Sequence, residues 1–243
     1  MTNKPWVIVV SGPNGAGKST FYKKILSQNP FLANAEFMNY DDTYANLQQT
    51  NINSSPVILR RQALSTVRYN IDSAFLNKKN IIFETTGAGI KQVQKQAIQN
   101  DYKIYGLHIT LKAPELSIAR VKHRVKNGGH DVPLDVIFER FNDNKTTLIN
   151  VLPLENVGIV IDNSGHRAFM PIFVLANRRI ASITKCPDFL QETYDTLCTM
   201  FPPEPIQNLL QTPQDVNINK MSENQREIFG QVIISQLLNQ IQK

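Results

Sequence analysis

A glycine-rich octapeptide, GPNGAGKS at residues 12–19, closely follows the β-branched run Trp6–Val10. It fits the pattern G-x-x-x-x-G-K-[ST], which builds a phosphate-binding loop when a strand precedes it and a helix follows. Both are expected here, because Trp6–Val10 is typical of a buried strand and Ser19–Ser27 of the helix after a glycine turn. The segment therefore restricts the chain to an α/β fold that begins with a phosphate loop.

Phosphate binding explains why glycine, lysine and hydroxyl residues occur at these positions of the octapeptide. Glycines let backbone N–H groups close around a β-phosphate, and the helix N-terminus adds a favourable dipole. We expect Lys18 to neutralise the β- and γ-phosphates, Ser19 to ligate Mg²⁺ and Thr20 to reach the α-phosphate. ATP with Mg²⁺ is the expected cofactor, and Lys18 is also a candidate catalytic residue. The expected nucleotide-binding residues are Gly12, Pro13, Asn14, Gly15, Ala16, Gly17, Lys18, Ser19 and Thr20.

Short β-branched runs alternate with helical stretches along most of the chain. Such alternation indicates a parallel sheet with right-handed crossovers and helices on both faces. We predict an α/β P-loop NTPase fold of the kinase-like type, with a parallel sheet of about five to six strands and a helical C-terminal extension. The expected strands are Trp6–Val10, Glu36–Asn39, Ile81–Glu84, Ile104–Leu111, Val157–Ile161 and, at an edge, Phe169–Leu175. The expected helices are Ser19–Ser27, Val57–Leu76, Lys91–Gln99, Pro114–Lys126 and Pro133–Ile149, with a polar loop from the second strand to Ser55.

The pattern changes at Cys186, beyond which prolines interrupt the helical segments. We expect a core at residues 1–184, with a lid around residues 114–145, and a helical appendage at residues 185–243. The last segment, Ser222–Ile241, is amphipathic. Such a stripe most often covers a core, although a dimer or a partner would also suit it.

The charge of the chain is uneven. The 243 residues carry 26 Lys and Arg against 20 Asp and Glu, a net charge of +6. Residues 1–184 hold 22 basic and 13 acidic side chains (+9), whereas residues 185–219 hold one and five (−4). A basic domain is typical of nucleic-acid binding, but this excess lies in the predicted α/β core that carries the phosphate loop, so we expect it mainly to serve the phosphates of ATP. Nucleic acid is therefore not the favoured partner.

Other features exclude several classes of protein. No apolar run approaches the ~18 residues of a membrane span, and the first apolar stretch is too short for a signal-peptide core. The two cysteines, Cys186 and Cys198, provide neither a disulfide framework nor a zinc-finger spacing. We expect a cytoplasmic protein with reduced thiols.

Two carboxylates, Asp41 and Asp42, follow the second expected strand, and Glu84-Thr85 ends the third. Ligands of open α/β sheets bind at the carboxyl ends of the strands. An Asp there would accept a proton from a hydroxyl that attacks the γ-phosphate, but helix capping explains the pair equally well. The chain lacks both the N/T-K-x-D motif of switch GTPases and the strand-terminal Asp-Glu of motor ATPases. A small kinase is therefore the favoured class.

A basic segment, ARVKHRVKNGGHDVP, occupies residues 119–133. Arg120 and Arg124 are four residues apart and share a helix face. Gly128-Gly129 forms a hinge, and the next expected helix carries Arg140. Two basic helices joined by a glycine turn predict a lid whose arginines fold onto the transferring phosphoryl group. A solvated basic face is the alternative.

The chain contains, in this order, the segments GPNGAGKST, FMNYDD, FETTG, ARVKHRVKNGGHDVP and IDNSG. Together they resemble the zeta-toxin family of P-loop kinases, in particular its compact, stand-alone branch, over roughly Lys4 to Asn177. The resemblance implies ATP-dependent phosphorylation of a hydroxyl on a small molecule. In studied members this acceptor is a UDP-activated amino sugar, UDP-N-acetylglucosamine. A small helical antitoxin protein is the partner that the resemblance implies.

The resemblance also implies roles at the strand ends. Asp41 corresponds to the general base, because it follows the strand and Asn39. Glu84 corresponds to a carboxylate near substrate and metal, and Thr85 to a substrate contact. Tyr40 is bulky where the family favours a small residue, so Asp42 remains an alternative base.

In the lid, Arg124 and Arg140 resemble the phosphate-contacting catalytic arginines, with Arg120 as a further nucleotide contact. For His130 we expect mainly a structural role in the lid turn. Asn163 follows the fifth strand, where adenine recognition is usual in this architecture, although a plain turn explains the Asn-Ser-Gly sequence equally well.

Two other functions fit the same core. One is a kinase for another acceptor, such as a nucleoside, an antibiotic or a polynucleotide end. Arg60, Arg61 and Arg68 would suit such an anionic acceptor, although a solvated helix face is as good an explanation. The other is a non-catalytic, ATP-dependent nucleic-acid-binding protein. It ranks last, because basic and aromatic residues are not interleaved as in single-strand binders.

Overall fold

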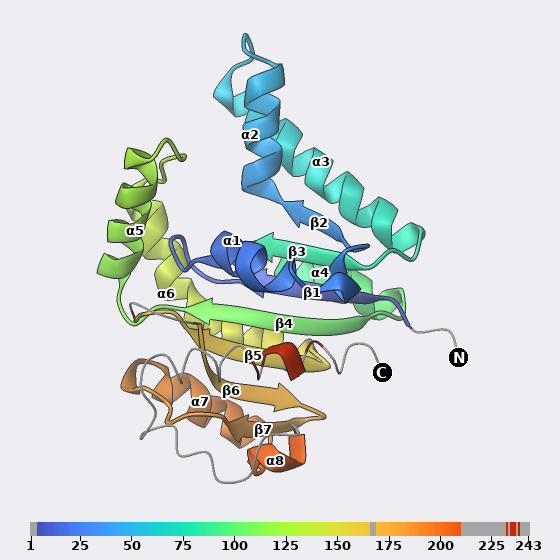
Figure 1. Ribbon diagram of the computed structural model, residues 1–243, viewed down its shortest axis with the longest axis vertical. Coiled ribbons are helices and arrows are strands. Elements are labelled where there is room, and N and C mark those ends of the chain that lie inside the picture. Colours follow the sequence, from blue (N-terminus) through green and yellow to red (C-terminus); the bar gives the residue numbers. More distant parts are fainter. Residues whose placement is uncertain (1–3, 166–168, 210–231, 233, 237, 239–243) are drawn as a thin grey trace.

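The computed structural model describes residues 4–165, 169–209, 232, 234–236 and 238, and this part of the chain forms a seven-stranded sheet flanked by helices (Figure 1). The strand order is β2-β3-β1-β4-β5-β6-β7. The strands are β1 (Trp6–Ser11), β2 (Glu36–Asn39), β3 (Ile81–Thr85), β4 (Lys103–Thr110), β5 (Val157–Asp162), β6 (Met170–Ala176) and β7 (Arg179–Ser182). β1 to β5 pair in parallel. The predicted kinase-like P-loop fold is confirmed.

The last two strands depart from the expected parallel sheet. β6 pairs antiparallel with β5, and β7 antiparallel with β6. Asn177 and Arg178 connect β6 to β7 with φ angles of 51° and 58°, and a two-residue turn with positive φ angles joins antiparallel strands. β6 is therefore not the edge strand. The sequence did not predict β7, because RIAS is a short run that follows polar residues.

The helices follow the expected order, with one addition. They are α1 (Lys18–Phe21), α2 (Tyr40–Thr50), α3 (Pro56–Leu76), α4 (Ile90–Gln99), α5 (Pro114–Lys126), α6 (Leu134–Val151), α7 (Asp188–Met200) and α8 (Ile206–Leu209). A π-helical turn, Tyr22–Leu26, continues α1, and 3-10 turns occupy Pro30–Leu32 and Leu152–Leu154.

Helix α2 replaces most of the polar loop that the sequence predicted after the second strand. The Asn39 side chain caps the helix, because its Oδ1 accepts hydrogen bonds from the backbone N–H groups of Asp41 (2.6 Å) and Asp42 (3.2 Å). Both aspartates lie in the first turn, where negative charge is favourable. None of the residues of α2 is buried, so the segment has no strong apolar periodicity to reveal it.

The sheet is covered on both faces. All six residues of β1 are buried, and they alternate between two core clusters: Ile8 and Val10 pack on the side of Phe21, whereas Val7 and Val9 pack on the side of α3 and α4. A third cluster joins β6 to α6 and α7. Helices α2 and α3 project beyond the sheet edge as a pair (Figure 1).

The expected C-terminal helix, Ser222–Ile241, lies mostly outside the described residues. Its described members, residues 232, 234–236 and 238, are helical. Ile234 and Leu238 are buried in the same core cluster as Ile8, so this part of the stripe covers the core. The proposed boundary at residue 184 stays a prediction. In the described part of the chain, no helix is both long enough and apolar enough to span a membrane.

Candidate active site

The octapeptide forms a loop between β1 and α1 at the carboxyl ends of the parallel strands (Figure 1). Gly12 has a φ of 149°, and a Cβ there would overlap the backbone oxygen of Ile109. Gly17 has a φ of 93°, and a Cβ there would lie 2.7 Å from Asn163 Nδ2. Both positions therefore require glycine. The loop takes the strand–loop–helix context that phosphate binding demands.

Lys18 is folded into this loop. Its Nζ donates hydrogen bonds to the backbone oxygens of Gly12 (2.9 Å) and Pro13 (3.2 Å), and only 8% of the residue is exposed. Burial lowers the pKa of Lys18 to about 8, although the negative charges of Glu84 and Asp41 act in the opposite direction. The loop carbonyls thus hold the ammonium group, and burial opposes its charge.

Glu84 stands beside Lys18 at the end of β3. It is buried, and its Oε1 accepts a hydrogen bond from Ser19 Oγ at 2.9 Å. Its Oε2 is also buried and has no well-formed hydrogen bond within the described residues. Burial raises the pKa of Glu84, while the charge of Lys18 opposes that rise. Ser19 and Glu84 therefore bring a hydroxyl and a carboxylate together beside Lys18.

Asp41 faces the same cluster from the first turn of α2. Burial alone would raise its pKa, but a hydrogen bond and the charge of His130, together with Lys18 and Arg124, outweigh burial and lower the pKa of Asp41. Its Oδ2 lies 3.3 Å from His130 Nε2. Asp42 is exposed. The structure thus brings Asp41, Glu84 and Lys18 together, and it directs Asp41 towards the lid.

The segment that the sequence predicts to be a lid, and that we call the lid, comprises α5, α6 and the turn between them. Arg140, on α6, donates a hydrogen bond to Asn14 Oδ1 at 3.2 Å. Arg124, at the end of α5, donates to the backbone oxygen of His130 at 3.0 Å, and its buried Nε has no partner among the described residues. The positive charges of Arg124 and Arg140 both act on Lys18. Both arginines therefore lie close to the phosphate loop.

Arg120 and Asn163 support the loop from its other side. Arg120 donates to the backbone oxygens of Asn163 (2.7 Å) and Gly15 (3.3 Å). The amide of Asn163 donates to the backbone oxygen of Ala16 at 2.8 Å. Both side chains that were expected to contact nucleotide thus hold loop carbonyls in this structure.

Two further expected contacts, Thr85 and Thr20, lie outside the cluster. The Thr85 hydroxyl donates to the backbone oxygen of Ala88 (2.8 Å) and accepts from the N–H of Gly87 (3.2 Å), so it stabilises the turn after β3. Thr20 is exposed at the start of α1. The sequence reasoning missed two contacts: His130 with Asp41, and Asn14 with Arg140. Both contacts depend on how the lid packs against the rest of the chain. The sequence placed these residues in motifs, but it carried no signal for the contacts between them.

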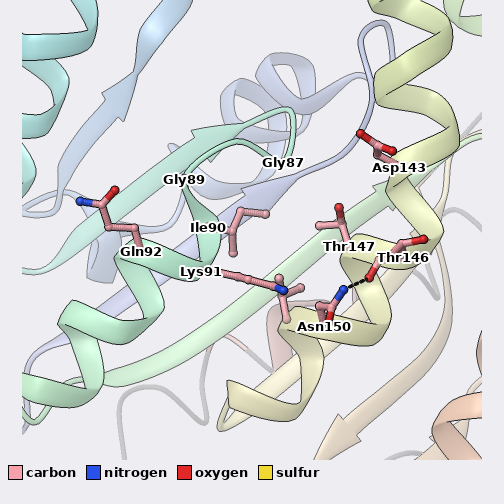
Figure 2. Close-up of a pocket in the computed structure, with 10 residues that line it drawn as sticks. Gly87, Gly89, Ile90, Lys91, Gln92, Asp143, Thr146, Thr147 and Asn150 are labelled. Atoms are coloured by element: carbon pink, nitrogen blue, oxygen red, sulfur yellow. Dashed lines mark hydrogen bonds between the residues drawn. The ribbon is translucent and has the colours of Figure 1, made fainter.

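A cavity of about 290 Å³ lies between the N-terminal end of α4 and helix α6, beside the turn that follows β3 (Figure 2). Gly87, Gly89 and Lys91 line it on one side, and Asp143 and Thr147 on the other. Gln92 also lines the cavity and accepts a hydrogen bond from Arg68 of α3 at 3.5 Å. Within the described residues there is no cluster of three or more metal-ligating side chains.

The sheet order, the phosphate loop and the adjoining lid define a P-loop protein of the kinase type. A family model described as Zeta toxin matches residues 1–170, and the chain belongs to this family. An uncharacterized protein of Haemophilus influenzae (strain ATCC 51907 / DSM 11121 / KW20 / Rd) is 29% identical over 147 residues, which are 58% of this chain and 94% of that protein.

Solved structures share the fold at low sequence identity. The chain resembles a structure of AvrRxo1-ORF1:AvrRxo1-ORF2 with sulphate ions (TM-score 0.60, 12% identity, 80% of this chain and 63% of that chain). It also resembles a structure of AvrRxo1-ORF1:-ORF2 with ATP (TM-score 0.57, 12% identity, 96% and 76%). A third is the PezAT chromosomal toxin-antitoxin system of Streptococcus pneumoniae (TM-score 0.52, 17% identity, 98% and 88%). The predicted family and fold are therefore confirmed.

Proposed function

We propose that this protein is a kinase that transfers the γ-phosphoryl group of ATP to a hydroxyl of a small molecule, with UDP-N-acetylglucosamine as the favoured acceptor. The observation that carries the proposal is the cluster of Lys18, Asp41 and Glu84 under two lid arginines. A phosphate-binding lysine, a carboxylate that accepts a proton and positively charged arginines are the groups that phosphoryl transfer uses. Membership of the zeta toxin family and a related structure with ATP support the same assignment.

In the proposed reaction, Asp41 is the general base. Its lowered pKa keeps the carboxylate ionised at neutral pH, so it accepts the proton of the acceptor hydroxyl. The hydroxyl oxygen then bonds to the γ-phosphorus as the bond to the bridging oxygen of ADP breaks. Lys18 turns from the loop carbonyls to the phosphates, and Arg124 and Arg140 stabilise the charge on the transferring group. Asp41 and His130 would separate as the acceptor enters.

Ser19 and Glu84 fit a Mg²⁺ ion. A hydroxyl oxygen and a carboxylate oxygen without a hydrogen bond are both ligands that Mg²⁺ accepts, and this ion usually takes only one or two protein ligands besides phosphates and water. The ion would neutralise charge between the β- and γ-phosphates. It would also compensate the buried carboxylate of Glu84, whose pKa is otherwise raised.

The acceptor would enter between the lid and the α2–α3 pair. The cavity beside α4 supports a small-molecule acceptor, because it is lined by Gly87, three residues after Glu84 (Figure 2). Arg60, Arg61 and Arg68 are exposed on α3, and Arg68 reaches the cavity wall at Gln92. Their positive charge suits the diphosphate of a UDP-sugar, and it would equally suit another anionic acceptor. A small antitoxin is the proposed partner, because related folds occur in a toxin-antitoxin system and in an ORF1:ORF2 complex.

The test is an ATP- and Mg²⁺-dependent phosphorylation assay with UDP-N-acetylglucosamine and a panel of other UDP-sugars and nucleosides. Lys18→Ala and Asp41→Asn should each abolish product formation. Asp42→Asn is the matched control, because this exposed residue lies in the same helical turn, and it should retain most of the activity. Full turnover by Asp41→Asn would refute the assignment of the base, and product from a different acceptor alone would refute the UDP-sugar.

A further inference from the structure

A chain of four hydrogen-bonded polar side chains lies inside the sheet, behind the phosphate loop. Ser11 Oγ is 2.6 Å from His108 Nδ1, and His108 Nε2 is 3.0 Å from Glu155 Oε2. Gln94 Nε2 donates to Glu155 Oε1 at 2.9 Å. Each of the four residues is at most 7% exposed. None of them takes part in the proposed reaction.

Two glycines in the sheet leave room for the side chain of Glu155. Gly106 on β4 and Gly158 on β5 are paired neighbours, and a Cβ at either position would overlap Glu155 Oε2. Glycine inside a strand lowers stability by roughly 0.5–1 kcal/mol. A buried ion pair usually adds little stability compared with apolar packing. A contribution to the stability of the fold therefore does not explain why a carboxylate, an imidazole and two glycines occur together here.

The network is not a hydrolytic Ser-His-Glu site. Ser11 is 2% exposed and His108 is fully buried, so no substrate can reach the hydroxyl. The network instead lies where β1 ends and the phosphate loop begins. Ser11 is the last residue of β1, opposite His108 on β4, and the next residue, Gly12, packs directly on the backbone oxygen of Ile109. The hydrogen bond from Ser11 to His108 thus holds the point where the strand becomes the phosphate loop.

Glu155 determines how His108 makes that bond. His108 Nε2 lies 3.1 and 3.0 Å from the two carboxyl oxygens of Glu155, and an N–H at this position donates to them. His108 Nδ1 is thereby directed at Ser11 with the ring fixed in one orientation. Gln94 also donates to the backbone oxygen of Val151, at the end of α6. The network therefore connects the loop entrance to α4 and to the helix that carries Arg140.

We propose that His108 is a positioning residue that sets the phosphate loop for nucleotide binding by fixing Ser11. This inference rests on the proposed binding of ATP. It requires that nucleotide affinity depends on the Ser11–His108 bond itself, independently of how stable the folded chain is. The loss of one well-placed buried hydrogen bond should weaken binding roughly tenfold.

Two substitutions of His108 separate positioning from stability. His108→Gln keeps a donor for Glu155 but cannot reach Ser11, whereas His108→Asn keeps a polar partner for Ser11 and leaves Glu155 without its imidazole. With the full chain, Mg²⁺ and the non-hydrolysable analogue AMPPNP, calorimetry should give a roughly tenfold higher Kd for His108→Gln and Ser11→Ala. His108→Asn should bind almost as the wild type does, yet have the lower Tm of the two His108 variants, because the buried carboxyl group of Glu155 then keeps only the hydrogen bond from Gln94.

Thr110→Val is the matched control. Thr110 is equally buried on β4, two residues beyond His108, and its hydroxyl donates to the backbone oxygen of Ile161 at 3.0 Å. Its loss should lower Tm and leave Kd unchanged. Affinities that follow Tm across all the variants, or wild-type Kd values for Ser11→Ala and His108→Gln, would overturn the positioning role. If His108→Asn does not fold, the comparison of Kd and Tm between Ser11→Ala and Thr110→Val decides between the two roles. A wild-type protein that binds no AMPPNP would instead refute the proposed function on which the inference rests.

Discussion

Replacing Lys18 by methionine should stabilise the nucleotide-free protein while abolishing its activity. Burial lowers the pKa of Lys18 from 10.5 to about 8. The difference of about 2.5 units, at about 1.4 kcal/mol per unit, places the cost of the buried charge at about 3 kcal/mol. Methionine removes this cost but leaves the backbone oxygen of Gly12 without its donor, a loss of about 1–2 kcal/mol, whereas the oxygen of Pro13 keeps the hydrogen bond from the N–H of Ala16. The net gain should be about 1–2 kcal/mol.

For a chain of 243 residues, this gain raises Tm by about 2–8 °C. Scanning calorimetry of the nucleotide-free protein at pH 7 measures it. The folded-state pKa lies below the unfolded-state value, so between pH 8 and 10.5 the unfolded chain binds more protons and the wild type gains stability as pH rises. The advantage of the methionine variant should therefore be full below pH 8 and disappear by about pH 10.5.

Two controls complete the experiment. Lys95→Met, at an exposed position on α4, should change Tm little at any pH. ATP with Mg²⁺ should raise the Tm of the wild type, because a ligand of the folded state stabilises it, and should not raise that of Lys18→Met. A methionine variant that is less stable than the wild type at pH 7, or a difference that does not change between pH 7 and 10, would refute the reasoning.

Three other substitutions test the same site. Gly17→Ala places a methyl group against Asn163 in a left-handed backbone conformation, so nucleotide binding by calorimetry should be lost; binding within threefold of the wild type would contradict this. Glu84→Gln removes the carboxylate expected to hold Mg²⁺, so half-maximal phosphorylation should need roughly tenfold more Mg²⁺, and an unchanged Mg²⁺ titration would remove Glu84 from that role. His130→Ala removes the group that does most to lower the pKa of Asp41, so a ¹³C NMR titration of Asp41 should move to higher pH; an unmoved titration would show that the contact does not form in solution.

The sequence predicted the phosphate loop and most of the elements around it, because their signals are local. Fixed glycine spacing, β-branched runs and helical periodicity determined β1, β3, β4 and β5 and the helices α3 to α6 within a few residues. Helix α2 was missed for the opposite reason: it buries none of its residues, and its start depends on the Asn39 cap. The antiparallel hairpin of β6 and β7 depends on a two-residue turn of Asn177 and Arg178, which no glycine marks.

The site was less predictable than the fold, because its side chains meet across long sequence separations. The pairing of Asp41 with His130 and of Asn14 with Arg140 requires the lid to lie over the loop. The placement of Arg120 and Asn163 on loop carbonyls requires α5 and the end of β5 to meet behind it. No local pattern records such contacts. The Ser11–His108–Glu155 network is of the same kind, since its members come from two strands and a turn.

The exposure of helix α2 has a consequence for how this protein can evolve. Beyond its first turn it packs on α3 outside the core and contributes no buried side chain (Figure 1). Substitutions at exposed helical positions usually alter stability by less than about 0.5 kcal/mol. Mutations can therefore accumulate along α2, beside the proposed acceptor entrance, without endangering the phosphate loop. Acceptor preference is in this sense evolvable separately from the machinery that handles the nucleotide.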